Sequence, residues 1–197
     1  MIEILLIRHG KTKGNVERRY IGKTDEPLSK EGIQEIEGKE YPQISFLGGS
    51  PMLRCKQSAD IAYGSDYTYH TYPGLKEMDF GDFENKNYEE LNGNEKYQAW
   101  IDSNGTDPFP NGEDKEGFIH RCLEAWEEVV SDLRNNHIEK AALFLHGGTI
   151  MSILSTYGDI KKDYFDWKKE NACGYFVELD PDKWITGEKV IYIKKEI

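Results

Sequence analysis

Two histidines follow the ends of buried strands in this chain of 197 residues. Residues 2–7 form a mostly apolar run that leads into Arg8 and His9, and residues 141–145 form another that leads into His146. A glycine comes after each histidine, which allows a sharp turn or a close backbone approach to a ligand. If the two strands are neighbours in a parallel sheet, the histidines meet at the edge where such sheets bind ligands.

The charged residues beside these histidines favour a doubly charged tetrahedral anion as the ligand. Arg8 precedes the first histidine, and Arg54 lies early in a helix predicted over residues 52–63, after a short strand at residues 44–47. The planar guanidinium group of arginine can donate two hydrogen bonds to phosphate oxygens. A helix that begins near Thr149 would direct its N-terminal N–H groups to the same place. The sequence therefore predicts a phosphate site at this edge of the sheet.

Glu77 is the candidate acid for chemistry at such a site. It comes shortly after a strand predicted at residues 67–72, within the stretch LKEMDFGDFE. A carboxylic acid here could give a proton to a leaving oxygen and later take one from water. Asp79, Asp82 and Glu84 lie close by in the sequence, so a solvated acidic loop is the rival interpretation.

The order of elements along the chain predicts an α/β fold. Strands and helices alternate, which indicates a three-layer α/β/α sandwich around a mostly parallel central sheet. We expect a single domain over residues 1–197, with residues 85–117 as an inserted lid, because that stretch is rich in asparagine, glycine and proline. Residues 84–117 carry nine acidic residues against three lysines, a local balance of −6. The remaining predicted elements are helices at residues 28–39 and 118–135 and from about Thr149 onward, and two strands within residues 173–193.

Composition and charge limit the class of partner. The formal net charge is −11 and the isoelectric point is near 5.0, which argues against nucleic acid or an anionic membrane, because both attract basic surfaces. The three cysteines are odd in number and widely spaced, so neither a disulfide framework nor a zinc site is indicated. No apolar run approaches the roughly 18 residues that cross a membrane, and no signal peptide pattern is present. We expect a cytoplasmic protein that acts on a small molecule; the sequence does not indicate an oligomeric state.

Four motifs, in order along the chain, resemble those of the histidine phosphatase superfamily, also called phosphoglycerate mutase-like. One such motif alone is weakly specific, whereas four in the right order, spread from residue 2 to about 180, are strongly so. The motifs are Arg8-His9-Gly10 with Thr12 and Asn15, the stretch GKTDEPLSKEG at residues 22–32, the stretch SPMLRCKQSA at residues 50–59, and His146-Gly147-Gly148.

The resemblance implies a mechanism with a covalent intermediate. His9 would be the nucleophile and would become phosphohistidine, and Glu77 would be the proton donor. Such chemistry depends on positioning and on neutralising the charge of the phosphoryl group. The resemblance implies no metal and no other cofactor. The residues expected to bind the phosphate or the substrate are Arg8, Thr12, Asn15, Arg54, His146 and Gly147.

A phosphatase is favoured over a mutase of the same family. A mutase must hold substrates with two anionic groups, and those of this family have an arginine directly after the acid. Here Met78 follows Glu77, and residues 84–117 contain no arginine. The alternatives are a phosphoglycerate mutase-type phosphotransferase and a binding module without catalysis; the retained histidines, arginines and acid speak against the second.

The substrate is less defined than the chemistry. Residues 77–81, EMDFG, look like the acid motif of α-ribazole phosphatases, so α-ribazole 5′-phosphate is one possible substrate, beside a sugar phosphate or a broad range of esters. The family often has Trp-Glu-Gly where this chain has Phe83-Glu84-Asn85, and Pro-x-Gly-Glu-Ser where it has residues 110–114, PNGED. Three aromatic residues of the same region either pack the lid or form a substrate platform: Tyr88, Tyr97 and Trp100.

Overall fold

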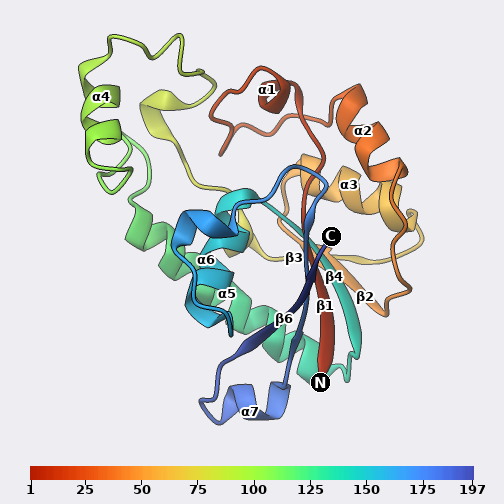
Figure 1. Ribbon diagram of the computed structural model, residues 1–197. Helices are drawn as coiled ribbons and strands as arrows, with labels where there is room; N and C mark the ends of the chain where they lie inside the picture. The colour runs from red at the N-terminus through yellow and green to blue at the C-terminus, as the bar shows by residue number, and fades with distance from the viewer.

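The structure, a computed structural model, describes residues 1–197 and contains one six-stranded sheet in the order β3-β2-β4-β1-β5-β6 (Figure 1). The four strands from β3 to β1 run parallel to one another, whereas β5 pairs antiparallel with both β1 and β6. The predicted α/β fold with a mostly parallel sheet is thus confirmed. The strands are β1 (Ile2–Arg8), β2 (Phe46–Gly49), β3 (Tyr69–Thr71), β4 (Lys140–Leu145), β5 (Gly174–Leu179) and β6 (Ile191–Glu196).

Alternating side chains of β1 enter two separate hydrophobic cores. Ile4 and Leu6 belong to the larger core, and Leu5 and Ile7 to the smaller one. Successive side chains of a strand point to opposite faces of the sheet, so β1 is covered on both sides. This is why its sequence is a continuous apolar run rather than an alternating one, and why the fold has three layers.

Helices cover both faces of the sheet (Figure 1). The helices that contribute to the larger core are α5 (Lys115–Asn135), α6 (Gly147–Tyr157) and α7 (Pro181–Ile185). Those that contribute to the smaller core are α2 (Lys30–Glu37) and α3 (Leu53–Tyr63). The short elements are α1 (Lys13–Val16), α4 (Glu95–Asp102) and three 3₁₀ helices, η1 (Pro73–Leu75), η2 (Gly81–Phe83) and η3 (Tyr164–Trp167). None of the helices combines the length and the apolar character that crossing a membrane requires.

Several predicted boundaries differ from the structure because local capping and pairing decide them. Strand β2 is displaced from residues 44–47 to residues 46–49, because its pairing with β4 begins at Phe46 and continues through two glycines. Helix α5 begins three residues before the predicted Phe118, because the Asp114 side chain accepts the backbone N–H of Gly117. Helix α7 divides the predicted pair of C-terminal strands and was not expected.

Residues 85–117 contain α4 and lie at one end of the molecule, beyond the edge where the strands of the parallel part end (Figure 1). Their apolar side chains share a third, smaller core with the segment that follows η1 and with the start of α5. The first turn of α5 falls within this range, so the segment passes directly into the helix. Movement of residues 85–117 as a lid stays a prediction. The buried members of this third core are Met78, Phe83, Leu91, Phe109, Phe118 and Cys122.

Candidate active site

His9 and His146 lie side by side at the carboxyl ends of neighbouring strands. Strands β1 and β4 pair in parallel with Arg8 opposite Leu145, so the next residue of each chain segment is a histidine. The two imidazole rings have centroids 5.1 Å apart and an interplanar angle of 67°. His9 is 4% exposed and His146 is fully buried. The predicted meeting of the two histidines at one edge of the sheet is therefore confirmed.

The hydrogen bonding of His9 leaves one ring nitrogen available for attack. Its Nδ1 lies 2.7 Å from the backbone oxygen of Gly10. A carbonyl oxygen only accepts, so Nδ1 carries the proton and donates it. Burial, and then the positive charges of Arg54 and Arg8, hold the pKa of His9 well below its usual range. The ring is therefore neutral, with its lone pair on Nε2.

Two arginines beside His9 have N–H groups without a partner in the protein. Arg8 donates from Nη1 to the backbone oxygen of Lys169 at 2.6 Å, and Arg54 donates to the backbone oxygens of Thr24 and Gly22 at 2.8 and 2.9 Å. The Nε of each arginine is buried and unpaired. An unpaired buried donor costs about 1–3 kcal/mol, and more when it is charged. Neither side chain forms an ion pair, so the two together suit an anion with several oxygens.

His146 is held by a serine from the motif that also carries Arg54. Its Nε2 lies 2.7 Å from Ser50 Oγ, and the Cys55 sulfur lies 3.6 Å from the same nitrogen. Burial, and then the charges of Arg54 and other nearby cationic groups, keep the pKa of His146 well below its usual range. Both histidines are thus neutral groups within positively charged surroundings.

Glu77 accepts two backbone N–H groups, one from its own segment and one from helix α6. Its Oε1 accepts from Met78 at 3.0 Å and its Oε2 accepts from Gly148 at 3.2 Å. The orientation of the N-terminus of α6 toward the phosphate stays a prediction; one of its first N–H groups, that of Gly148, binds the acid. A Cβ added at Gly148 would overlap Glu77 Oε1 and lie 2.9 Å from Phe118 Cζ, so the present position of the acid depends on a glycine there.

Arg121 on α5 fixes the backbone around Glu77, a contact that the amphipathic pattern of that helix did not reveal. Its guanidinium donates to the backbone oxygens of Gly74, Lys76 and Glu77 at 2.8–3.0 Å. Glu113 binds the same guanidinium through both carboxylate oxygens, at 2.6 and 2.7 Å. The segment that carries Glu77 is therefore held by α5 through Arg121 and by α6 through Gly148.

Asn15 and Thr12, both expected at the phosphate, have different positions. Thr12 is fully buried and caps α1: its Oγ1 accepts from Asn15 N at 3.2 Å, while Asn15 Oδ1 accepts from Thr12 N at 3.1 Å. Asn171 also donates to Asn15 Oδ1, at 3.3 Å. Asn15 lines the cavity described next, whereas Thr12 does not. Thr12 thus supports the site through the α1 turn.

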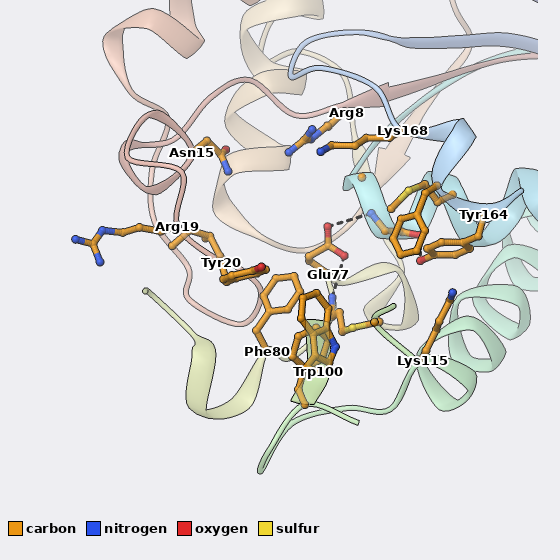
Figure 2. A pocket seen from close by; sticks show the side chains of 18 of the residues that line it. Arg8, Asn15, Arg19, Tyr20, Glu77, Phe80, Trp100, Lys115, Tyr164 and Lys168 are labelled. Carbon is orange, nitrogen blue, oxygen red and sulfur yellow. Dashed lines mark hydrogen bonds between the residues drawn. The ribbon is translucent and has the colours of Figure 1, made fainter. Parts of the chain in front are cut away.

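A cavity of about 390 Å³ lies over this edge of the sheet (Figure 2). Arg8, Asn15, Glu77 and Gly147 line it, and so does Lys168, whose side chain Figure 2 shows beside that of Arg8. His9, Arg54 and His146 are buried and are not among the residues that line this cavity, while the charges of Arg54 and Arg8 lower the pKa of the His9 ring. Several lining residues were not singled out by sequence reasoning, among them Arg19, Tyr20, Lys115, Met151, Tyr164, Phe165 and Lys168.

Aromatic side chains form the wall of the cavity opposite Arg8 and Lys168 (Figure 2). The Tyr20 ring lies 5.3 Å from Phe80 and 6.1 Å from Trp100, in edge-to-face contacts. Of the three aromatic residues considered from the sequence, Trp100 lines the cavity, Tyr97 stacks behind it at 6.1 Å, and Tyr88 is exposed.

Comparisons with known proteins show what this chain resembles in sequence and fold. The model of the histidine phosphatase superfamily (branch 1) matches residues 4–189. The uncharacterized phosphatase PhoE of Bacillus subtilis is 27% identical over 191 residues, covering 93% of this chain and 92% of its own. A protein of Salmonella arizonae named "Probable phosphoglycerate mutase GpmB" is 30% identical over 167 residues, covering 79% of this chain and 74% of its own. The crystal structure of the alpha-ribazole phosphatase from Shigella flexneri shares the fold, with a TM-score of 0.79 at 22% identity, covering 98% and 95% of the two chains.

Proposed function

Because the chain belongs to the histidine phosphatase superfamily, whose members are phosphatases or mutases, we propose that it hydrolyses small phosphomonoesters through a phosphohistidine on His9. The observation that carries this proposal is the state of the His9 ring. Its Nδ1 proton is committed to the Gly10 carbonyl, which leaves a neutral Nε2 beside two guanidinium groups that have unpaired N–H donors.

In the first step, His9 Nε2 attacks phosphorus and the bond from phosphorus to the ester oxygen breaks. Arg8 and Arg54 bind the phosphoryl oxygens, whose charge spreads in the transition state, and so stabilise it. The leaving oxygen takes a proton from the Glu77 carboxyl group. The alcohol departs, and the phosphoryl group stays on His9 as a phosphoramidate.

In the second step, water replaces the alcohol. The Glu77 carboxylate takes a proton from water as the water oxygen attacks phosphorus, and the bond from phosphorus to His9 Nε2 breaks. Inorganic phosphate leaves, and His9 and Glu77 return to their starting states. Neutral imidazole is a suitable nucleophile because it needs no deprotonation before attack.

Hydrolysis is favoured over mutase chemistry by the surroundings of the acid. Met78, which is buried, follows Glu77, and residues 84–117 supply no arginine to hold a second anionic group. Asp107 and Lys115 from that segment both line the cavity, so the segment adds no net positive charge there. A water molecule is therefore a better second acceptor than a phosphorylated acid.

The aromatic wall supports an ester with a planar apolar group. A ring placed against Tyr20, Phe80 and Trp100 would be held by stacking, worth about 1–3 kcal/mol for a base on an aromatic side chain. α-Ribazole 5′-phosphate, which carries such a base, is the specific substrate that we propose. The name of the Shigella flexneri relative and the EMDFG stretch at residues 77–81 support this choice.

Phosphate release from a panel of monoesters, measured with a chelator present, tests the proposal. The panel holds α-ribazole 5′-phosphate, para-nitrophenyl phosphate, 3-phosphoglycerate, fructose bisphosphates and nucleotides. We expect release from several esters, with α-ribazole 5′-phosphate turned over fastest. Turnover of that ester no faster than of para-nitrophenyl phosphate would contradict the substrate. No release from any ester would contradict the hydrolase, and a mutase assay with 3-phosphoglycerate would follow.

A further inference from the structure

Glu84 binds a loop of the backbone that lies next to the candidate site. Its Oε1 accepts the backbone N–H groups of Gly22 at 2.8 Å and Thr24 at 2.9 Å, and its Oε2 accepts that of Phe80 at 3.3 Å. Glu84 is half-buried and forms no ion pair with any cationic side chain. Its negative charge is therefore directed at these three N–H groups, and charge-assisted bonds of this kind are stronger than neutral ones.

The carbonyl groups of two of these residues, Gly22 and Thr24, accept hydrogen bonds from Arg54. Thr24 O accepts from Arg54 Nη1 at 2.8 Å and Gly22 O accepts from Nη2 at 2.9 Å. Each of the two residues thus connects a carboxylate on its N–H side with a guanidinium on its carbonyl side. The N–H and the carbonyl of one residue lie on different peptide groups, so the link from Glu84 to Arg54 is one of position and passes through the backbone of the loop.

The loop at residues 22–24 has little freedom to shift. A Cβ added at Gly22 would overlap the backbone oxygen of Met78 and lie 2.9 Å from Phe80 Cδ2, so the loop packs directly against the segment that bears the acid. On its other side, Asp25 accepts the backbone N–H of Leu53 at 2.8 Å and fastens the loop to the start of α3. Glu84 fastens the loop in the same way to the segment that carries Glu77, through its bonds to Gly22, Thr24 and Phe80.

We propose that Glu84 is a positioning residue that orients the Arg54 guanidinium for phosphate binding, acting through the peptide groups of residues 22–24. This inference rests on the proposed function, in which Arg54 binds the transferred phosphoryl group. Arg54 has no carboxylate partner, so the two loop carbonyls alone set the direction of its remaining N–H groups, including the buried unpaired Nε. Loss of Glu84 would let the loop relax and turn these donors away from the phosphate oxygens.

The test is a double-mutant cycle on phosphate affinity. Inorganic phosphate binding by calorimetry is measured for wild type, Glu84→Gln, Glu84→Ala, Arg54→Ala and the double variant Glu84→Ala with Arg54→Ala. We expect Glu84→Ala to weaken phosphate binding about tenfold in the wild-type background. In the Arg54→Ala background the same change should weaken binding less than about twofold, because Glu84 acts on phosphate through Arg54. Glu84→Gln, which keeps one accepting oxygen but loses the negative charge, should weaken binding by about three- to fivefold, less than Glu84→Ala does.

Glu127→Ala is the matched control. Glu127 is also half-buried and accepts three hydrogen bonds, from Tyr157, Trp184 and Lys189, but it lies on the other side of the molecule from the loop. Its loss should cost stability without changing phosphate affinity. Glu84→Gln, which keeps the side-chain volume, decides the question if Glu84→Ala does not fold.

Two results would overturn the inference. One is phosphate binding by a folded Glu84→Ala or Glu84→Gln protein within about twofold of wild type, and the other is full additivity of Glu84→Ala and Arg54→Ala. Hydrolysis of the ester panel is measured separately. A wild type that binds phosphate but hydrolyses nothing contradicts the proposed function and leaves the cycle decisive, whereas a wild type that binds no phosphate contradicts both.

Discussion

The Oε2 of Glu77 accepts a hydrogen bond from the backbone N–H of Gly148 at 3.2 Å, which joins the acid to the first turn of helix α6. Gly148 belongs to the segment that also carries His146. The acid, contributed by the stretch after η1, is thus placed against the same turn that follows the second histidine. The consequences of this arrangement can be measured.

Replacing Gly148 by alanine should disturb the acid. The new Cβ would overlap Glu77 Oε1 and press on Phe118, so Glu77 has to move away from the position it holds here. We expect turnover of an alkyl phosphate to fall by about tenfold or more, because general acid catalysis depends on placement. Steady-state kinetics measures this, and unchanged turnover in a folded Gly148→Ala protein would refute it. Gly147→Ala should lose much less, since its nearest added contact is 3.6 Å, to Arg8.

Replacing Glu77 by glutamine should affect esters according to their leaving group. An alkyl alcohol needs a proton to leave, and loss of the acid should slow its release by about 10²–10⁴-fold. Nitrophenolate leaves without a proton, so the first step with para-nitrophenyl phosphate should slow far less. Rapid-mixing kinetics on both esters measures the two effects. Equal losses for both leaving groups would show that Glu77 is not the proton donor.

The buried histidines should make the folded state sensitive to mild acid. Burial and nearby arginines lower the pKa of both His9 and His146 below 6.5. As the pH falls below 6.5 the unfolded chain binds protons that the folded chain does not, so the free energy of unfolding decreases until the folded pKa is reached. Each such histidine contributes a slope of about 1.4 kcal/mol per pH unit in that window.

Urea unfolding at a series of pH values checks this sign and slope. The variant His146→Gln should show a shallower decrease between pH 6.5 and 5 than wild type, whatever its stability at pH 7. His120→Gln serves as the control, since His120 is exposed and pairs only with Glu124 on the surface. A His146→Gln protein with the same slope as wild type would be inconsistent with a neutral buried His146.

Trp100 should select for planar esters. Trp100→Ala removes part of the aromatic wall, so the KM for α-ribazole 5′-phosphate should rise by about tenfold, as expected for the loss of one stacking contact. The KM for a small aliphatic phosphate should change little. Tyr88→Ala is the control, because Tyr88 is exposed and does not line the cavity. A similar rise for both esters would assign Trp100 to packing alone.

The parts of the site that lie on strands could be predicted from the sequence. Arg8, His9 and His146 stand directly after continuous apolar runs, and such runs belong to buried parallel strands whose ends share one edge. The fold class follows from the same runs and from the periodic helices between them. The positions of these residues therefore depend on regular structure, which local sequence pattern reports well.

The parts that the sequence did not reveal depend on contacts between distant loops. Tyr20 reaches the cavity from one segment and Tyr164 and Lys168 reach it from another, and nothing in their local patterns differs from an ordinary surface. The roles of Arg121 and Glu84 arise from bonds to backbone groups more than 40 residues away. Thr12 shows the opposite case, since its motif position suggested a ligand and its side chain caps a helix.

The most direct test of the account is detection of the phosphate on His9. Wild type and Glu77→Gln protein, in which release to water is slowed, are exposed briefly to para-nitrophenyl phosphate, quenched in base and analysed by peptide mass spectrometry. The account predicts a phosphate on His9 that is stable in base and labile in acid, and a loss of turnover of at least about a hundredfold in His9→Gln. Phosphate on another residue, or His9→Gln turning over near the wild-type rate, would contradict it.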